Sequence, residues 1–464
     1  MEKVDRKDFS YDLELGDGAL SGDEKRKSTC DTPTEDISHE NEQKDDSRNQ
    51  SLASTYSSTP IPDGTLRGWL QILSGFMLYF NSWGMVTAFG IFQLHYSNVM
   101  LRSESNSSIS WIGTIQGFLL AVGSVFAGCV LDRGHPRRLI AFGGFFTVLG
   151  LMMTSLCTTY WQIFLAQGVC IGLGSGALFI VAVAVIPGWF EKRRAIATGL
   201  AATGSSIGGV VYPITFHKLE PMIGFGWSLR VMGFMALATC AISFACAKMR
   251  TLPPPRPKIV DFSGFRELLF TLFAIVSFIG AMGLYVPFFY ITEYSLKRGS
   301  VSGELVYYML PILSAGSILG RTSPAFLADR CGCLKVLTFT TAISSILALV
   351  WIAVTGQAGV IVWSLLYGAF SGAFVSLQTP TIAAITPDLR LVGGRMGMNN
   401  FCLALGVLVG NPVAGAIGGN FKEESRWIGM QVFTGLCLAI AAILVGVTWH
   451  VKAKQDRASS KEES

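Results

Sequence analysis

Twelve long stretches of predominantly apolar residues constrain this chain more than any other feature. A bilayer core of roughly 30 Å needs about 20 apolar residues per helix, and hydrocarbon accepts only segments that satisfy their own backbone hydrogen bonds. Only 14% of the residues are charged, against roughly 25% in soluble domains. The pattern predicts an all-α membrane protein that crosses the lipid bilayer at 69–92, 109–131, 139–158, 162–189, 196–218, 227–248, 267–291, 305–328, 336–356, 359–386, 396–418 and 427–450.

The polar segments divide the chain into two halves. Residues 1–66 are rich in Ser, Asp, Glu and Lys, and such a composition predicts a disordered tail, which is either a phosphorylation platform or simply solvated. A Pro-rich linker at 249–266 cannot continue a helix and separates a six-helix half at 67–248 from a second one at 267–451. Residues 452–464 form a second polar tail.

Lysine and arginine in the short loops indicate the orientation, because they favour the cytoplasmic side. With the N-terminus in the cytoplasm, the inside loops carry DRGHPRR, EKRR, DRCGCLK and PDLRLVGGR, whereas the outside loops near Cys157 and Gly356 carry no basic residue. Both termini are therefore predicted to be cytoplasmic, in the plasma membrane or an internal membrane. The net charge of +5 reflects this bias, and no basic face indicates nucleic acid as a partner.

An N-glycosylation sequon, Asn106-Ser-Ser, falls in the first predicted outside loop. Such triplets are glycosylated on surface segments of secreted or membrane proteins. The sequence therefore predicts a glycan at Asn106.

The ends of the second and eighth spans resemble one another. GSVFAGCVLDR at 123–133 aligns with GRTSPAFLADR at 320–330, so that Asp-Arg closes both spans. Related halves are typical of transporters that hold substrate near the bilayer midplane. The alignment places Arg321 opposite Ser124 and, at roughly 1.5 Å per residue, about 12 Å inside the membrane.

Arg321 is costly at this depth. An arginine at the centre of a spanning helix costs about 2.5–3.5 kcal/mol even on the lenient insertion scale, so it faces a water-filled cavity or a partner. We therefore expect Arg321 to bind an anionic or strongly polar group of a substrate. The alternative is a structural arginine that bonds carbonyl groups of another helix.

Three motifs carry a family resemblance. They are NSWGMVTAFG at 81–90, preceded by PDG at 62–64 and by Trp69, then GCVLDRGHPRR at 128–138, and WFEKRRAIATGLAATGSSIGG at 189–209. Residues 62–450 resemble the monocarboxylate-porter family of the major facilitator superfamily, and within it the fungal members. The resemblance implies two pseudo-symmetric halves that rock around a central substrate.

The charged loops offer opposite charges that would lock the cytoplasmic face in one state and separate in the other. The alternative is that these charges only set the topology. The predicted gating residues are Asp132, Arg133, Glu191, Arg194, Asp329 and Arg330.

One departure from the family bears on the substrate. Animal lactate carriers of this family have a lysine late in the first helix and an aspartate one turn before the arginine of the eighth, and these serve proton and carboxylate binding. The matching positions here hold Thr87 and Ser317. The resemblance therefore implies an anionic substrate at Arg321 without that scheme of proton–lactate symport.

Aromatic and amide side chains in several spans predict a larger site than lactate needs, which favours a bulkier conjugated substrate. Phe288, Tyr290 and Asn399 are further candidates beside the main set. The predicted substrate-binding residues are Arg321, Asn81, Thr87, Gln167, Tyr285, Phe289, Tyr367, Gln378 and Asn400.

Other classes of function find less support. There is no HExxH, and the histidines are scattered, so no enzyme is predicted. The lone Cys331-Gly-Cys333 lacks further ligands, so neither metal nor cofactor is predicted. The leading hypothesis is a secondary transporter of a small organic molecule, an organic acid or an aromatic or secondary metabolite. The alternatives are a nutrient receptor that has lost transport and, as the fungal resemblance implies, a riboflavin-like vitamin importer. The proton is a candidate coupling ion, through Glu293.

Overall fold

The computed structural model describes residues 64–190, 193–250, 262–298, 301–386, 391–419 and 424–462. The predicted tail at 1–63 and most of the predicted linker lie outside the described residues. In the described ranges every regular element is a helix, in the order α2 (Leu66–Asn81), α3 (Trp83–Thr87), α4 (Phe89–His95), η1 (Tyr96–Met100), α5 (Asn106–Leu131), α6 (Pro136–Thr154), α7 (Tyr160–Ile163), η2 (Phe164–Ile171), α8 (Gly172–Val185), η3 (Ile186–Trp189), α9 (Arg194–Cys246), η4 (Phe262–Arg266), α10 (Leu268–Leu284), α11 (Val286–Lys297), η5 (Gly303–Tyr308), α12 (Met309–Cys331), α13 (Cys333–Val350), η6 (Trp351–Ala353), α14 (Gln357–Ile385), α15 (Val392–Gly418) and α16 (Glu424–Glu462).

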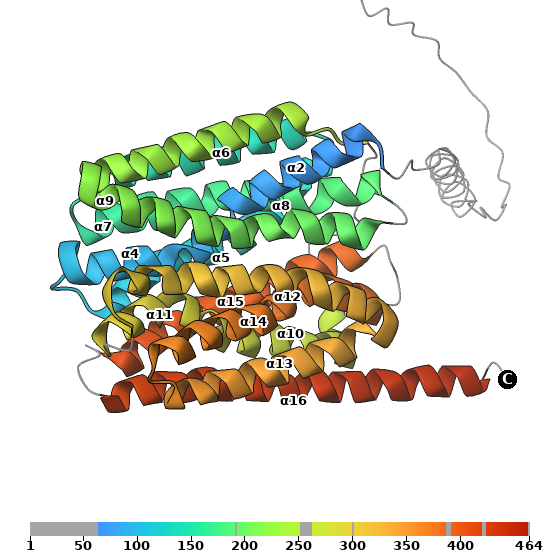
Figure 1. Cartoon of the computed structure of the whole chain (residues 1–464). Helices are drawn as coiled ribbons and strands as arrows, with labels where there is room; N and C mark the ends of the chain where they lie inside the picture. Colours follow the sequence, from blue (N-terminus) through green and yellow to red (C-terminus); the bar gives the residue numbers. More distant parts are fainter. Residues whose placement is uncertain are drawn as a thin grey trace, which may run out of the picture. The chain divides into compact units, whose positions relative to one another are not determined.

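The helices run side by side along one direction, so the bundle has two ends (Figure 1). α2 begins and α16 finishes at one end, which we call the tail end and which also carries the turn at 132–135. The opposite end, the far end, carries the connections at 101–105 and 155–159. In the predicted orientation the tail end is cytoplasmic.

Ten helices of the described residues are long and apolar enough to cross a membrane. The differences from the predicted spans have local causes. α9 covers two predicted spans and is interrupted at Gly224, whose φ of 79° and ψ of 167° are not helical. The first predicted span is divided into α2, α3 and α4, of 16, 5 and 7 residues, each too short to span alone. The all-α membrane fold is confirmed.

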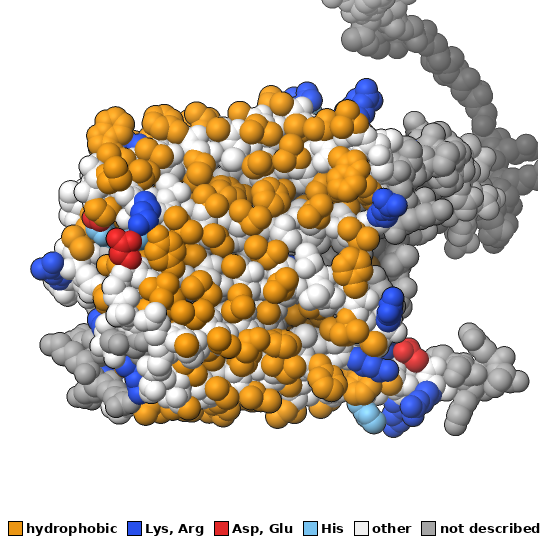
Figure 2. Space-filling model, viewed as in Figure 1, with side chains coloured by type: hydrophobic (Ala, Val, Ile, Leu, Met, Phe, Trp, Pro, Cys, Tyr) orange, Lys and Arg blue, Asp and Glu red, His pale blue; other side chains and the backbone are white. Residues whose placement is uncertain are grey.

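The outer surface of the bundle is apolar around its middle (Figure 2). Large side chains such as Phe126, Trp161 and Phe339 are exposed, whereas most Lys and Arg side chains in this view lie near the two ends. A soluble monomer rarely exposes so large an apolar patch, and a multi-pass membrane protein needs one for its lipid contact.

The two predicted halves touch along several helix pairs. α5 packs against α15, α9 against α12, and α4 against α11. The backbones approach closely where glycine faces a partner: a Cβ on Gly90 of α4 would lie 2.3 Å from the Phe288 carbonyl oxygen of α11. Small residues drive such packing in lipid, and α4 and α11 thereby meet near the far end.

Candidate functional site

The Arg321 guanidinium is buried in the bundle. Arg321 lies in α12 with 7% of its surface exposed, and its Nε has no hydrogen-bond partner. Its electrostatic neighbours are the phenol groups of Tyr285 and Tyr79. Tyr79 belongs to the first predicted half and Tyr285 to the second, so the arginine lies where the two halves meet.

Arg321 differs from the two other charged side chains that are buried in the described part of the chain. Arg395, 1% exposed, holds the Glu267 carboxylate with both terminal nitrogens, one at 2.7 Å. Glu293, 0% exposed, accepts a bond from Lys297 Nζ at 2.5 Å. Arg321 alone of these three is without an oppositely charged partner among the described residues, and buried charges are normally paired.

Arg395 also corrects the sequence analysis. The span prediction placed it in a basic loop, one residue before a helix at 396–418. The structure begins α15 at Val392, so Arg395 lies inside that helix and bonds Glu267, the residue before α10. The bidentate pair is a structural link within the second half, because it uses both terminal nitrogens of the guanidinium.

Aromatic rings from both halves pack on the two tyrosines that neighbour the arginine. Trp83 of α3 stacks on Tyr285, with ring centroids 5.6 Å apart and planes at 12°. Phe179 of α8 lies edge-on to Trp83 at 6.1 Å and to Tyr79 at 5.7 Å. Of this cluster the sequence analysis singled out only Tyr285. Trp83 lies within the 81–90 motif, which is the one sequence signal that pointed to it.

The hydroxyl groups of Thr87 and Ser317 both donate hydrogen bonds to backbone carbonyl groups. These two residues are the ones that the resemblance aligns with charged residues of the lactate carriers. The Thr87 hydroxyl donates to the Trp83 carbonyl at 3.1 Å, within its own helix turn. The Ser317 hydroxyl donates to the Gly368 carbonyl of α14 at 3.1 Å. Neither hydroxyl supplies a charge to Arg321, which agrees with the expected departure from proton–lactate symport.

Two predicted amides connect helices of the first half. Asn81 donates to Thr239 Oγ1 at 2.8 Å and accepts from the Tyr212 hydroxyl at 2.7 Å. Gln167 accepts from the Tyr96 hydroxyl at 2.5 Å. Asn81 and the accepting oxygen of Gln167 thus already have protein partners, so we assign both residues to helix packing in this conformation.

Two predicted aromatic residues also have structural partners. The Tyr367 hydroxyl donates to the Leu284 carbonyl at 3.0 Å. Phe289 packs against Phe89 with centroids 5.0 Å apart, which joins α11 to α4. Tyr367 and Phe289 therefore have packing partners of their own in this conformation.

Gln378 leads a polar cluster in the second half. Its Oε1 lies 2.9 Å from the Ser277 hydroxyl and 3.0 Å from Asn399 Nδ2, while its Nε2 is buried without a partner. Asn400, which was predicted to bind substrate, is half-buried and is not part of this cluster. Its neighbour Asn399 is the residue that bonds Gln378. Gln378 keeps one donor for a ligand.

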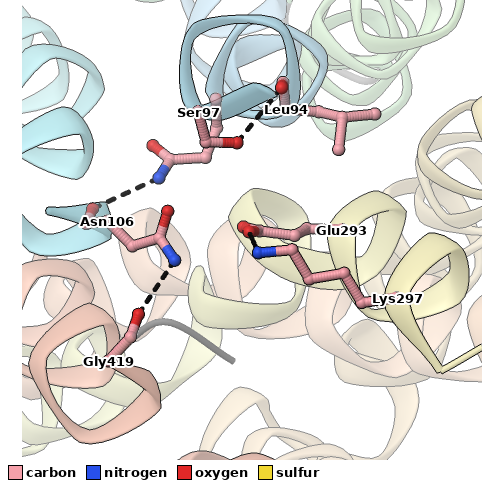
Figure 3. A network of polar contacts seen from close by, with 7 residues as sticks. Leu94, Ser97, Asn106, Glu293, Lys297 and Gly419 are labelled. Carbon is pink, nitrogen blue, oxygen red and sulfur yellow. Dashed lines mark hydrogen bonds and ion pairs between the residues drawn. The ribbon is translucent and has the colours of Figure 1, made fainter. Parts of the chain in front are cut away.

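A network that centres on Asn106 joins the two halves at the far end of the bundle (Figure 3). Asn106 Nδ2 donates to the Gly419 carbonyl at 2.9 Å, and the Asn106 carbonyl accepts from Gln93 at 3.2 Å. The Glu293 carboxylate, held by Lys297, faces the same amide. Gln93 and Asn106 belong to the first half, and Gly419, Glu293 and Lys297 to the second, so the network ties the halves together.

This network speaks against the predicted glycan. Asn106 is the first residue of α5 and is buried, and its Nδ2 is the atom that a glycan would occupy. The triplet was assigned to an exposed loop because hydropathy started the helix at 109. In this conformation Asn106 is an inter-half contact, and we do not propose it as a glycosylation site.

The predicted gating loops lie at the tail end. Asp132 follows α5 and is half-buried, while Arg133 and Arg330 are exposed. Glu191 and the side chains of Arg194 and Asp329 lie outside the described residues. The proposed charge lock therefore stays a prediction.

The helices form a bundle with an apolar belt, and a buried cation without a counter-charge lies between its halves. These features are typical of a membrane transport protein rather than an enzyme. The profile of the Major Facilitator Superfamily matches residues 72–325 and 312–464. The chain belongs to the Major Facilitator Superfamily, and membrane transport of a small molecule follows from that membership.

Curated relatives from fungi cover most of the chain. The MFS-type transporter dbaD of Emericella nidulans is 41% identical over 82% of this chain and 86% of the relative. The Agnestins efflux protein AgnL12 of Paecilomyces divaricatus is 35% identical over 84% and 89%, and the Aspyridones efflux protein apdF of Emericella nidulans is 33% identical over 83% and 78%. These are proteins to which the chain is similar.

Proposed function

We propose that this chain is a monocarboxylate-porter-like secondary transporter that exports an organic acid or an anionic aromatic secondary metabolite by alternating access. The observation that carries the proposal is the buried Arg321 guanidinium, which no described carboxylate neutralises and which lies between the halves. A carboxylate or phenolate of the substrate would supply the missing charge. Bidentate bonding of a planar anion suits an arginine.

Outward transport is proposed from the relatives. Two of them are named efflux proteins, for agnestins and for aspyridones. We also propose that the protein lies in the plasma membrane with its tail end in the cytoplasm. We propose that the Asn106 network keeps the far end closed in this conformation, so that substrate enters from the tail end. Rocking of the halves would then break that network and release the substrate at the far end.

Proton coupling is proposed separately, and its candidate residue is Glu293. This carboxylate is buried at the closed far end and would meet water once the halves separate there. Movement of protons along intramembrane carboxylates is a recurrent device in transporters. Glu293→Gln in vesicles with an imposed pH gradient tests it: flux that still responds to the gradient as in the wild type contradicts the proposal.

The test of the main proposal compares intracellular and secreted small molecules in the native host. Three strains are needed, with the gene deleted, restored, and restored as Arg321→Ala, the last checked for normal surface expression. We expect one anionic compound to accumulate inside the deletant and the Arg321→Ala strain. A compound left unconsumed in the medium would instead indicate an importer, as for a riboflavin-like vitamin. The absence of any difference would favour a receptor without transport.

A further inference from the structure

The stacked pair Trp83 and Tyr285 joins the halves beside Arg321. Trp83 belongs to α3 of the first half, and Tyr285 lies between α10 and α11 of the second. Their centroids are 5.6 Å apart with planes at 12°, which is an offset stack without room for a third ring. In this conformation each ring therefore covers one face of the other.

The position of Tyr285 links the stack to the anion site. Its phenol group is an electrostatic neighbour of the Arg321 guanidinium, and its ring stacks on part of the Trp83 indole. A molecule whose anionic group reaches Arg321 therefore has Tyr285 beside it. Phe179, edge-on to Trp83 at 82°, supports the indole from the first half.

We propose that Trp83 and Tyr285 form a clamp that selects a flat aromatic ring attached to the anionic group, and this inference rests on the proposed function. Each ring covers the other while the site is empty. When the halves move apart, the substrate ring enters between them and stacks on both. A saturated ring of the same size would lose these two contacts, because it has no π face to offer.

The test compares two carboxylic acids that share a skeleton and differ in flatness: 2-naphthoate and decahydro-2-naphthoate. Binding of each to the purified full-length protein in lipid nanodiscs is measured by calorimetry. We expect 2-naphthoate to bind about tenfold more tightly, the size that two aromatic contacts supply. Trp83→Leu should reduce this preference to about threefold, because the Tyr285 ring still offers one contact, and Trp83→Phe should retain most of it. Tyr285→Leu gives the same test from the other half if Trp83→Leu does not fold.

A matched control is Trp363→Leu. Trp363 is also a buried tryptophan stacked on a tyrosine, Tyr367, at 5.1 Å and 16°, but both rings belong to the second half. The preference should survive this change. Equal binding of the two acids by the wild type, binding of neither, or an equal loss in the Trp83 and Trp363 variants would overturn the clamp. The metabolite comparison with Arg321→Ala judges the proposed function separately, since it does not depend on the substrate having a ring.

Discussion

Two buried arginines in this protein differ in what surrounds their charge. Arg395 has the Glu267 carboxylate beside it. Arg321 has only phenol groups as electrostatic neighbours, and its Nε makes no hydrogen bond. A buried charge without a counter-charge is unfavourable for folding. The Glu267 carboxylate offsets part of the cost of burying Arg395, whereas no described carboxylate does so for Arg321, which is why we propose an anionic ligand there.

Removing the counter-charge of Arg395 should destabilise the protein. Glu267→Ala leaves the 1% exposed guanidinium without this carboxylate. Because Glu267 itself is 42% exposed, we expect the lower end of the range of about 3–5 kcal/mol for breaking a buried pair. Thermal unfolding in detergent measures it, with Glu267→Asp as the control that keeps the charge. A melting temperature equal to that of the wild type would show that the pair is not a stabilising link.

Arg321→Met should behave in the opposite way. Methionine keeps much of the side-chain volume and removes the unpaired charge, so the melting temperature should stay equal or rise. The same variant should have lost transport. A clear fall in the melting temperature of the empty protein would instead assign Arg321 to structure.

The partners of a buried polar side chain cannot be predicted from its place in the sequence, and Asn81 is an example. Asn81 was taken for a ligand because hydropathy shows only that an amide lies in an apolar stretch. Its partners Tyr212 and Thr239 are 131 and 158 residues away, and no local pattern reveals such pairing. Arg321 was recognised because its cost in a membrane is independent of its neighbours.

At the scale of elements, the helix interruptions shape the site. α10 and α11 are separated at Tyr285, and Pro287 follows within the first turn of α11, where proline removes a backbone donor. α2 and α3 are separated at Ser82, whose hydroxyl bonds the Leu78 carbonyl at 2.7 Å. Hydropathy predicted most span ends to within a few residues. It did not predict these interruptions, because they change the backbone angles without changing the apolar composition.

Close helix packing in the second half predicts a sensitive glycine. A Cβ on Gly368 of α14 would lie 1.9 Å from the Leu313 carbonyl oxygen of α12, whereas on Gly199 of α9 the nearest atom would be at 3.9 Å. Gly368→Ala should therefore lower the free energy of unfolding by about 1–3 kcal/mol through overpacking. Gly199→Ala, also within a helix, is the control and should change it little. Equal melting temperatures for both variants would contradict the close approach of α12 and α14.

At the scale of the whole molecule, Asn106 is one of several polar residues that join the halves at the far end, together with the Ser107–Pro412 hydrogen bond and the Lys218–Glu304 ion pair. Asn106 contacts Gly419 and faces Glu293 across the interface. The sequence alone could not predict this arrangement, because Asn106 and Glu293 are 187 positions apart in the chain. The network exists only once the two halves are assembled.

A second carboxylate at this point should open the far end. Asn106→Asp places like charges face to face at a buried position, which is unfavourable. We expect spin labels at Arg102→Cys and Ser302→Cys, one on each half and both exposed, to move apart in a background freed of reactive cysteines. Ser105→Asp adds the same charge at the neighbouring exposed cap position and should leave the distance unchanged. An unchanged distance in Asn106→Asp would refute the closing role of the network.

The central claim is that Arg321 binds the anionic group of the transported molecule where the halves meet. The most direct measurement is exchange of the compound that accumulates in the deletant across proteoliposomes, using the acid and its neutral methyl ester, with wild type, Arg321→Lys and Arg321→Ala. We predict saturable exchange of the acid by the wild type, weakened exchange by Arg321→Lys, and none by Arg321→Ala, with the ester failing to compete. Exchange of the acid by Arg321→Ala at the wild-type rate would contradict the account.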